Sequence, residues 1–155
     1  MLTHLDSQGR VRMVDVSSKA PTARVAVAEG MISMNEGAFA AIIKGNAPKG
    51  DVLSCARIAA IQASKRTSEL IPLCHPLYLS KVEVSLVADE INHSFTLSCT
   101  TATVGPTGVE MEALTAVSVG LLTIYDMAKA MDRSMHITNI HLVCKDGGKS
   151  GEFHA

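Results

Sequence analysis

The sequence predicts an α+β fold of the split-βαβ, or ferredoxin-like, type, with helices packed on one face of an antiparallel sheet. Short segments at 23–33, 81–88, 94–104 and 135–145 alternate apolar and polar residues, which is typical of strands. Segments at 51–67 and 107–133 repeat apolar residues with helical spacing. With a further short helix at 35–43, they predict in order the pattern β-α-α-β-β-α-β, which is the split-βαβ arrangement with one extra short helix.

Length and composition narrow the class of protein. A chain of 155 residues has the size of one ordinary domain. Its formal net charge is -1, so we do not expect a nucleic-acid or anionic-membrane partner, and any anion site must be local. Aromatic residues make up 3% of the chain and Trp is absent, which predicts an aliphatic core and argues against a base-stacking surface.

The sequence also predicts a cytoplasmic location. Apolar runs stay short of the roughly 18 residues of a membrane span, and the start, MLTHLDSQGRV, lacks the apolar core of a signal peptide. Four cysteines at 55, 74, 99 and 144 show no CxxC spacing. We expect them to be reduced and mostly packed.

The first part of the chain divides into an irregular arm and the start of a domain. Residues 1–22 are polar, contain Gly9 and Pro21, and show little periodicity, so they predict an arm that can become ordered against a partner chain. Residues 23–155 form a single ferredoxin-like domain in this prediction. Residues 23–33 predict its first strand, with a possible break at Gly30.

Two helices and a stiff loop are expected next. Asn35 is a suitable N-cap for a short helix through Ile43, with Gly45 just beyond its end. A second helix starts at Asp51 and presents one wide apolar face as far as residue 65 or 67. The segment LIPLCHPLYLS then contains Pro72 and Pro76, which disfavour helix and predict an extended, anchored loop.

The second half of the chain predicts a hairpin, a long helix and a last strand. Residues 81–88 and 94–104 are strands separated by DEINH. Residues 107–133 are helical and strongly apolar, and residues 135–145 partly alternate. The final DGGKSGEFHA is a Gly-rich tail.

The long helix carries charges that require an explanation. Glu110, Glu112, Asp126 and Lys129 lie in an apolar segment that should be buried, and a buried charge is costly unless it is paired or faces a wet cleft. Asp126 and Lys129 share one face, so they form either an ordinary ion pair or part of a site. Glu112 and Asp126 are about 20 Å apart along a continuous helix, so one chain cannot place both in one small site.

Alternatives stay open for these and the other charged residues. Glu110 and Glu112 can simply meet the positive end of the helix dipole. Lys49 precedes a helix start that could hold phosphate, although a capped turn with a solvated lysine explains it as well.

The loop and the tail offer two further candidate sites. His75, held between Cys74 and Pro76, could contact a ligand or be a packed loop residue. Spacing supports no zinc site. Lys145 and Lys149 flank glycines that could grip an anion, or belong to a solvated tail. A P-loop is excluded because Val143 stands where that motif needs glycine.

Longer sequence motifs reduce the number of these functional alternatives. The phrases KGDVLSCARIAAIQASKRTSELIPLCHPL, TGVEMEALTAVSVGLLTIYDMAKAMDR, KDGGKSG and MVDVSSKAPTAR closely resemble the MoaC family, the cyclic pyranopterin monophosphate synthases of molybdenum-cofactor biosynthesis. The resemblance covers nearly the whole chain, and only the tail, with Asp146 in place of a small polar residue and the extension GEFHA, departs from the family pattern. It implies a lyase that converts 3',8-cyclo-7,8-dihydroguanosine 5'-triphosphate into cyclic pyranopterin monophosphate and releases diphosphate.

The resemblance also implies site residues and an assembly. Its catalytic positions match Asp126, Lys129 and Lys49, and its substrate-binding and pocket-lining positions match Leu73, Cys74, His75, Met111, Glu112, Glu110, Arg24 and Lys145, with Arg24 and Lys145 on phosphate. It implies a homohexamer, a trimer of dimers, whose sites lie between subunits. That assembly would let Glu112 and Asp126 meet from different chains. No metal or other cofactor is expected, although Mg²⁺ can accompany the triphosphate.

Two other classes of function remain possible on the fold alone. A ferredoxin-like domain can bind a small regulatory ligand without chemistry, or serve only as the structural subunit of an oligomer. Diphosphate release from the cyclised nucleotide would separate the enzyme from both. Stabilisation by phosphate compounds would separate a ligand site from a purely structural subunit.

Overall fold

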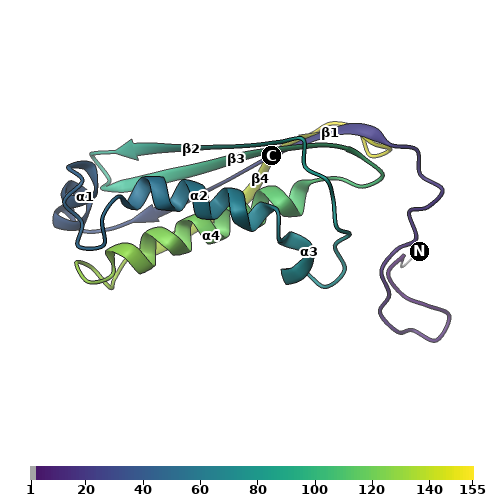
Figure 1. The fold of residues 1–155 in the computed structure, drawn as a ribbon, viewed down its shortest axis with the longest axis horizontal. Helices are drawn as coiled ribbons and strands as arrows, with labels where there is room; N and C mark the ends of the chain where they lie inside the picture. The colour runs from purple at the N-terminus through teal and green to yellow at the C-terminus, as the bar shows by residue number, and fades with distance from the viewer. Residues whose placement is uncertain (1–2) are drawn as a thin grey trace.

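A computed structural model describes residues 3–155 and has the predicted α+β architecture (Figure 1). The strands and helices, in chain order, are β1 (Thr22–Ser33), α1 (Glu36–Ile43), α2 (Val52–Ser64), α3 (Thr67–Leu70), β2 (Lys81–Asp89), β3 (Ser94–Gly105), α4 (Glu110–Ala128), β4 (His136–Asp146) and β5 (Phe153–His154). The sheet has the order β2-β3-β1-β4-β5, and every neighbouring pair is antiparallel. Without the short β5, this is the ferredoxin-like strand order, so the fold prediction is confirmed.

Local sequence explains where α1 and α2 begin and where the chain turns between β2 and β3. The Asn35 side chain accepts a hydrogen bond from the Ala38 backbone N–H and caps α1, and the Asp51 side chain caps α2 through the Ser54 N–H. The turn between β2 and β3 closes because the Asp89 carboxylate accepts from the Ile91 and Asn92 N–H groups. These caps agree with the boundaries expected from the sequence.

The two long helices form one layer beneath the sheet. α2 and α4 lie side by side and run in opposite directions, while the other face of the sheet carries no helix among residues 3–155 (Figure 1). Most inward residues of β1 and β3 are small or aliphatic, and Ile32, Leu97 and Leu121 are fully buried. The core is therefore mainly aliphatic, as the composition predicts, with Phe95 stacked on Phe39 as its aromatic pair.

Several details differ from the sequence prediction. β1 is continuous through Gly30, because that glycine serves close packing: an added Cβ would lie 2.8 Å from Leu121 and 2.9 Å from Ile140. The long helix is shorter than predicted and spans only Glu110–Ala128. Two short elements, α3 and β5, were not expected, because each is too short to show a periodic pattern.

The N-terminal arm crosses one end of the molecule. Among residues 3–21 there is no helix, and the only strand pairing is an isolated bridge between Leu5 and Val11. The Asp6 carboxylate closes the turn between them by accepting from the Gln8 and Arg10 N–H groups. Residues 1 and 2, which belong to the predicted arm, lie outside the described residues.

α4 is the one helix of residues 3–155 with the length and apolarity of a membrane span. Its most apolar window has a mean hydropathy of 1.3 and is 56% buried against the rest of the chain. Its packing against the sheet and α2 accounts for that apolar character, as expected for the core helix of a globular domain.

Candidate active site

Lys49, Asp126 and Lys129 come together at the C-terminal end of α4. The Lys49 Nζ lies 2.9 Å from Asp126 Oδ2, and the Lys129 Nζ lies 2.9 Å from Asp126 Oδ1. Each carboxylate oxygen therefore takes one ammonium group. The antiparallel packing of α2 on α4 produces this cluster, because it sets the loop before α2 beside the last turn of α4.

These three charges are exposed in the single chain, which corrects the expectation that Asp126 and Lys129 would be buried. The exposed side-chain fraction is 46% for Lys49, 56% for Asp126 and 43% for Lys129. The two ion pairs still act on the carboxyl: hydrogen bonds from Lys129 and Lys49 lower the pKa of Asp126 to about 2. Asp126 is thus an anion throughout the neutral range, between two cations.

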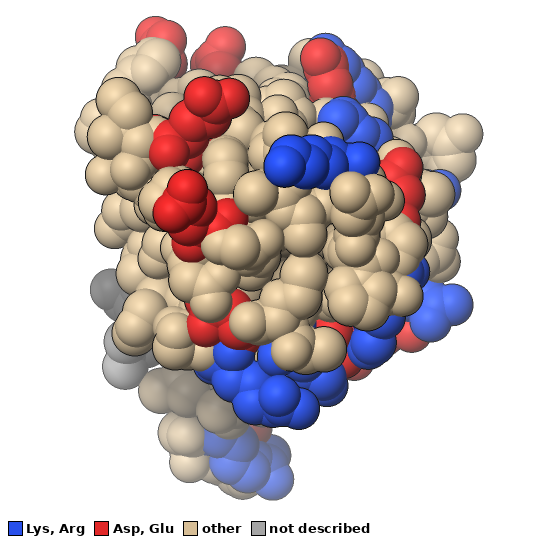
Figure 2. Space-filling model, turned by 90° about the vertical axis from the view of Figure 1, so that its left-hand side faces the viewer, with Lys and Arg blue, Asp and Glu red and all other residues tan. Residues whose placement is uncertain are grey.

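The end of the molecule that carries this cluster is unevenly charged. Figure 2 views that end and shows Lys and Arg side chains gathered along its lower edge, with acidic groups bordering them, and further basic side chains at the upper right. The cluster itself holds two positive charges and one negative charge. An anionic ligand is therefore favoured over a cation at this surface.

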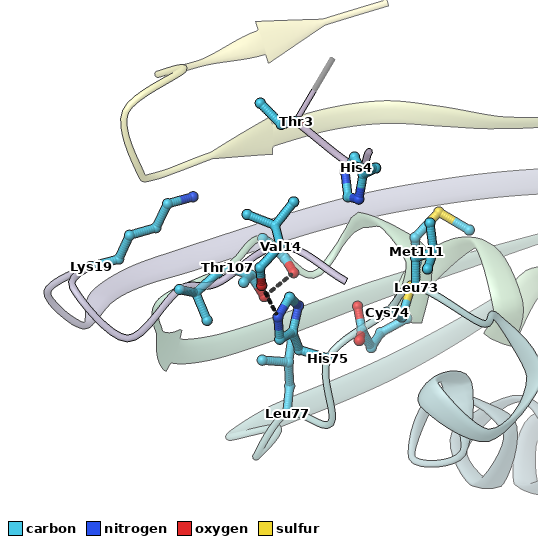
Figure 3. Close-up of a pocket in the computed structure, with 13 residues that line it drawn as sticks. Thr3, His4, Val14, Lys19, Leu73, Cys74, His75, Leu77, Thr107 and Met111 are labelled. Carbon is cyan, nitrogen blue, oxygen red and sulfur yellow. Dashed lines mark hydrogen bonds between the residues drawn. The ribbon is translucent and has the colours of Figure 1, made fainter. Parts of the chain in front are cut away.

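The residues at the other end of α4 line a separate pocket of about 330 Å³. The loop after α3 contributes Leu73, Cys74 and His75, and the first turn of α4 contributes Met111 and Glu112. Figure 3 shows His4 and Val14 of the N-terminal arm above His75, with Cys74 beside the histidine ring. The arm therefore forms one wall of the pocket.

The arm fixes the orientation and the tautomer of the His75 ring. The His75 Nε2 lies 2.7 Å from the Val14 carbonyl oxygen (Figure 3). Because a carbonyl can only accept, Nε2 must carry the hydrogen, and the neutral ring then keeps its lone pair on Nδ1. His75 is thus held in one orientation and one tautomer, which suits ligand contact more than simple packing.

Glu112 is the buried acid of this pocket. Its exposed fraction is 4%, and burial raises the pKa of its carboxyl to about 7, with the nearby Glu110 charge adding to the shift. Burial, followed by the Glu112 charge, raises the pKa of the Cys74 thiol. Cys74 is therefore a neutral thiol in this pocket and not a thiolate nucleophile.

A second pocket, of about 580 Å³, adjoins the first. Arg24, Lys145, Lys149 and Lys19 line it together with Glu110. Thr107, Gly108 and Lys19 line both pockets. Four cations facing one carboxylate make this pocket the strongest anion site among the described residues.

Hydrogen bonds fix the cations of the second pocket. The Arg24 Nε donates to the Gly105 carbonyl at 3.0 Å and Nη2 to the Pro106 carbonyl at 3.2 Å. Lys145 pairs with Glu110 at 3.4 Å and also contacts the Ser150 hydroxyl. Gly148, at a φ of +77°, lies directly against the Arg24 guanidinium, and a Cβ there would collide with it.

The predicted site residues therefore form two groups within one chain. Lys49, Asp126 and Lys129 lie at one end of α4, and all the other predicted residues lie at its opposite end. The sequence prediction did not include Lys19 or the Val14 carbonyl. Lys19 stands in the phrase MVDVSSKAPTAR, which could have indicated it, whereas a backbone carbonyl leaves no signal in a sequence.

The side chains of the two pockets and of the Lys49–Asp126–Lys129 cluster form no evident metal centre. Among residues 3–155, no group of three or more His, Cys, Asp or Glu side chains is arranged to hold an ion. The two pockets offer mainly cationic and neutral groups, which suit an anionic organic ligand.

Comparisons with known proteins agree over nearly the whole chain. The sequence model of the MoaC family matches residues 13–148. A protein of Cereibacter sphaeroides strain KD131, named cyclic pyranopterin monophosphate synthase, is 56% identical over 154 residues, which cover 99% of this chain and 97% of that protein. A protein of the same name from strain ATCC 17029 is 55% identical with the same coverage.

Proposed function

Because this chain belongs to the MoaC family, we propose that it is a lyase that forms cyclic pyranopterin monophosphate for molybdenum-cofactor biosynthesis. Its substrate is 3',8-cyclo-7,8-dihydroguanosine 5'-triphosphate, and diphosphate is the second product. The observation that carries this proposal is the 56% identity to a cyclic pyranopterin monophosphate synthase over 99% of the chain.

The two adjoining pockets divide the substrate between them. The triphosphate binds Arg24, Lys145, Lys149 and Lys19, since guanidinium and ammonium groups are the usual partners of phosphate oxygens. The purine-derived rings bind in the first pocket, where Leu73 and Met111 offer apolar contacts. His75 and Glu112 there supply the few polar contacts that fix orientation.

Asp126, Lys129 and Lys49 supply proton transfer and charge stabilisation. The reaction opens the purine ring system and closes a pterin ring, which requires several proton transfers. A sugar hydroxyl then loses its proton and bonds to the α-phosphorus, and the bond to the departing diphosphate breaks. Lysines can move the protons and stabilise the phosphate charge, while Asp126 holds Lys129 and Lys49 in place at 2.9 Å.

The complete site requires a second copy of the chain. Glu112 and Asp126 are about 20 Å apart along α4, so the catalytic cluster of one chain cannot reach its own pocket. In a homo-oligomer, the cluster of one copy faces the pocket of another. Apolar side chains on the outer helix surfaces, Ile58 at 67% and Leu122 at 57% exposure, are suited to contacts between copies.

The resemblance to the family supports a homohexamer, a trimer of dimers, with the reaction in the cytoplasm. Size-exclusion chromatography with light scattering would give the number of chains, and cell fractionation would give the location. We also propose that the protein holds no metal ion of its own. Any Mg²⁺ in the site is then bound to the triphosphate of the substrate. Protein stripped of metal by a chelator and then assayed with Mg²⁺ as the only divalent ion should turn over at the untreated rate; activity that only a transition-metal ion restores would contradict this.

Diphosphate release from the authentic substrate tests the function. The wild-type protein should release diphosphate, whereas Lys129→Ala and Asp126→Ala should not, although both should keep the fold and the oligomeric state. Lys44→Ala is a matched control, because Lys44 lies at the end of α1 on the same side of the molecule and belongs to neither pocket nor cluster. Substrate binding without diphosphate release by the wild type would show a ligand-binding domain instead.

A further inference from the structure

α2 and α4 leave one face of the sheet uncovered (Figure 1). Glu29 and His141 lie together on that face, since Glu29 stands between the inward-facing Ala28 and Gly30 of β1. They are directly opposite each other in the β1–β4 pairing, so their side chains point to the same side. They line a cavity of about 270 Å³ with Gly30, Met31, Thr96 and Asn139. None of these residues belongs to the pockets or the cluster described above.

The backbone fixes the orientation of the His141 ring. The His141 Nδ1 lies 2.6 Å from the Asn139 carbonyl oxygen, and Asn139 has a φ of +57° at an irregularity in the β1–β4 pairing. Because a carbonyl only accepts, Nδ1 carries the hydrogen. In the neutral ring, the lone pair is then on Nε2.

This lone pair faces the Glu29 carboxylate. The His141 Nε2 and Glu29 Oε1 are 3.6 Å apart, which is too long for a hydrogen bond. Two acceptors at this distance leave room for a cation between them. An ion with bonds of about 2.0–2.2 Å to nitrogen and oxygen sets two tetrahedral ligands about 3.3–3.6 Å apart, and the observed separation matches this spacing.

The surroundings support the same interpretation. A metal-bound histidine usually donates its other ring N–H to a carbonyl or carboxylate, as His141 does toward Asn139. The Ser98 hydroxyl lies 3.5 Å from the second Glu29 oxygen. The pair His154–Glu152 has the opposite geometry, since its 2.7 Å separation is a direct hydrogen bond in which Nε2 must carry the hydrogen.

We propose that Glu29 and His141 bind a divalent transition-metal ion of the zinc class on the open face of the sheet. Nε2 of His141 and Oε1 of Glu29 are its two protein ligands, and water completes the coordination. With only two ligands from the chain, the ion exchanges readily. The site is separate from the proposed lyase reaction and does not depend on it.

Metal titration of the whole protein tests the proposal. Zn²⁺ would be titrated against a chromophoric chelator, and Co²⁺ binding would be followed by its visible absorption. All proteins would carry Cys55→Ser, because Cys55 is an exposed thiol that also attracts zinc. The test variants are Glu29→Gln and His141→Gln, and the matched control is the double variant Glu152→Gln, His154→Gln. Nitrogen NMR of the histidine rings reports the tautomer of His141.

The expected result is one saturable ion per chain, with affinity reduced about tenfold or more in each test variant and unchanged in the control. Diphosphate release should be the same in all of these proteins. Equal binding in every protein would identify an adventitious ion elsewhere and overturn the proposal. Absence of saturable binding, or a His141 ring that carries hydrogen on Nε2 in metal-free protein near pH 7.5, would overturn it as well.

Discussion

At the scale of single residues, the pairing of Asp126 with two lysines determines what the proposed catalytic cluster can do. Each oxygen of its carboxylate holds one ammonium group at 2.9 Å, and these hydrogen bonds lower the pKa of Asp126 to about 2. Without Asp126, Lys49 and Lys129 would repel each other and lose their fixed positions. Asp126 therefore positions both lysines through all the pH values at which the protein would work.

Gly148 controls the position of Arg24, which we propose binds phosphate. Its φ is +77°, and a Cβ at this place would collide with the Arg24 guanidinium. We expect Gly148→Ala to displace Arg24 from the anion pocket and to raise KM about tenfold, the loss of one charge-assisted hydrogen bond. The value of kcat should change much less, and steady-state kinetics of diphosphate release would measure both constants.

Gly151→Ala is the matched control for this prediction. Gly151 also has a positive φ, of +66°, but a Cβ there would meet nothing within 4 Å. The two variants therefore share the backbone strain and differ only in the contact with Arg24. A similar rise of KM in both would show that strain in the tail, and not the position of Arg24, explains the effect.

At the scale of elements, Asp132 ties the end of α4 to the start of α1. Its carboxylate, on a residue only 8% exposed, accepts hydrogen bonds from the Asn35 N–H at 2.8 Å and from the Ser134 N–H and hydroxyl. These bonds, with the Ser134 hydroxyl first, lower the pKa of Asp132. The connection holds the last turn of α4, which carries Lys129, against the β1–α1 junction.

Asp132→Asn should reduce the free energy of unfolding by about 1–2 kcal/mol at pH 7. Because the pKa is lowered in the folded state, the carboxylate stabilises the fold fully above its ordinary value of 3.8. That contribution is lost as the pH falls through the lowered folded pKa. Urea unfolding at pH 7 and pH 3 should show the wild type and variant converging at the lower pH; an equal difference at both would refute a role for the ionised group.

Gly30 controls how closely α4 approaches the sheet. A Cβ at Gly30 would lie 2.8–3.0 Å from Leu121, Ile140 and Val117, so Gly30→Ala overfills a packed interior. We expect thermal unfolding to show a loss of about 1–3 kcal/mol. Gly37→Ala in α1, where the nearest atom is 3.6 Å away, should instead stabilise the chain by about 0.5–1 kcal/mol; a loss of the same size there would remove packing as the explanation.

The sequence was most informative where one short phrase determines one local structure. Asn35 and Asp51 as helix caps, the two prolines of the loop around His75, and the hairpin at residues 81–105 could all be predicted, because caps, breakers and alternation act over a few residues. The continuity of β1 at Gly30 could not, since its reason lies in α4 and β4, about a hundred positions further along the chain.

The same limit applied to the candidate site. Family phrases indicated which residues matter, and the rise of a helix per residue was enough to separate Glu112 from Asp126. The pairing of Lys49 with Asp126 required the packing of α2 on α4. The contact between the arm and His75 could not be predicted, because it is made by the backbone carbonyl of Val14. Every residue has such a carbonyl, so no sequence pattern identifies it.

At the scale of the whole molecule, the two ends of α4 carry different parts of the proposed site. One end carries an exposed ion-pair cluster without a pocket, and the other carries two adjoining pockets without that cluster. The arm and the tail contribute only to the pocket end, through Val14, Lys19 and Lys149. The central claim is that a complete site combines the cluster end of one copy with the pocket end of another.

Mixing two inactive variants tests this claim most directly. Asp126→Ala disables the cluster and His75→Ala disables the pocket, so either protein alone should release no diphosphate. If the two are dissociated, mixed equally and reassembled, about a quarter of the sites combine an intact cluster with an intact pocket. Diphosphate release near a quarter of the wild-type rate is expected, whereas a mixture as inactive as its components would show that each chain builds its site alone.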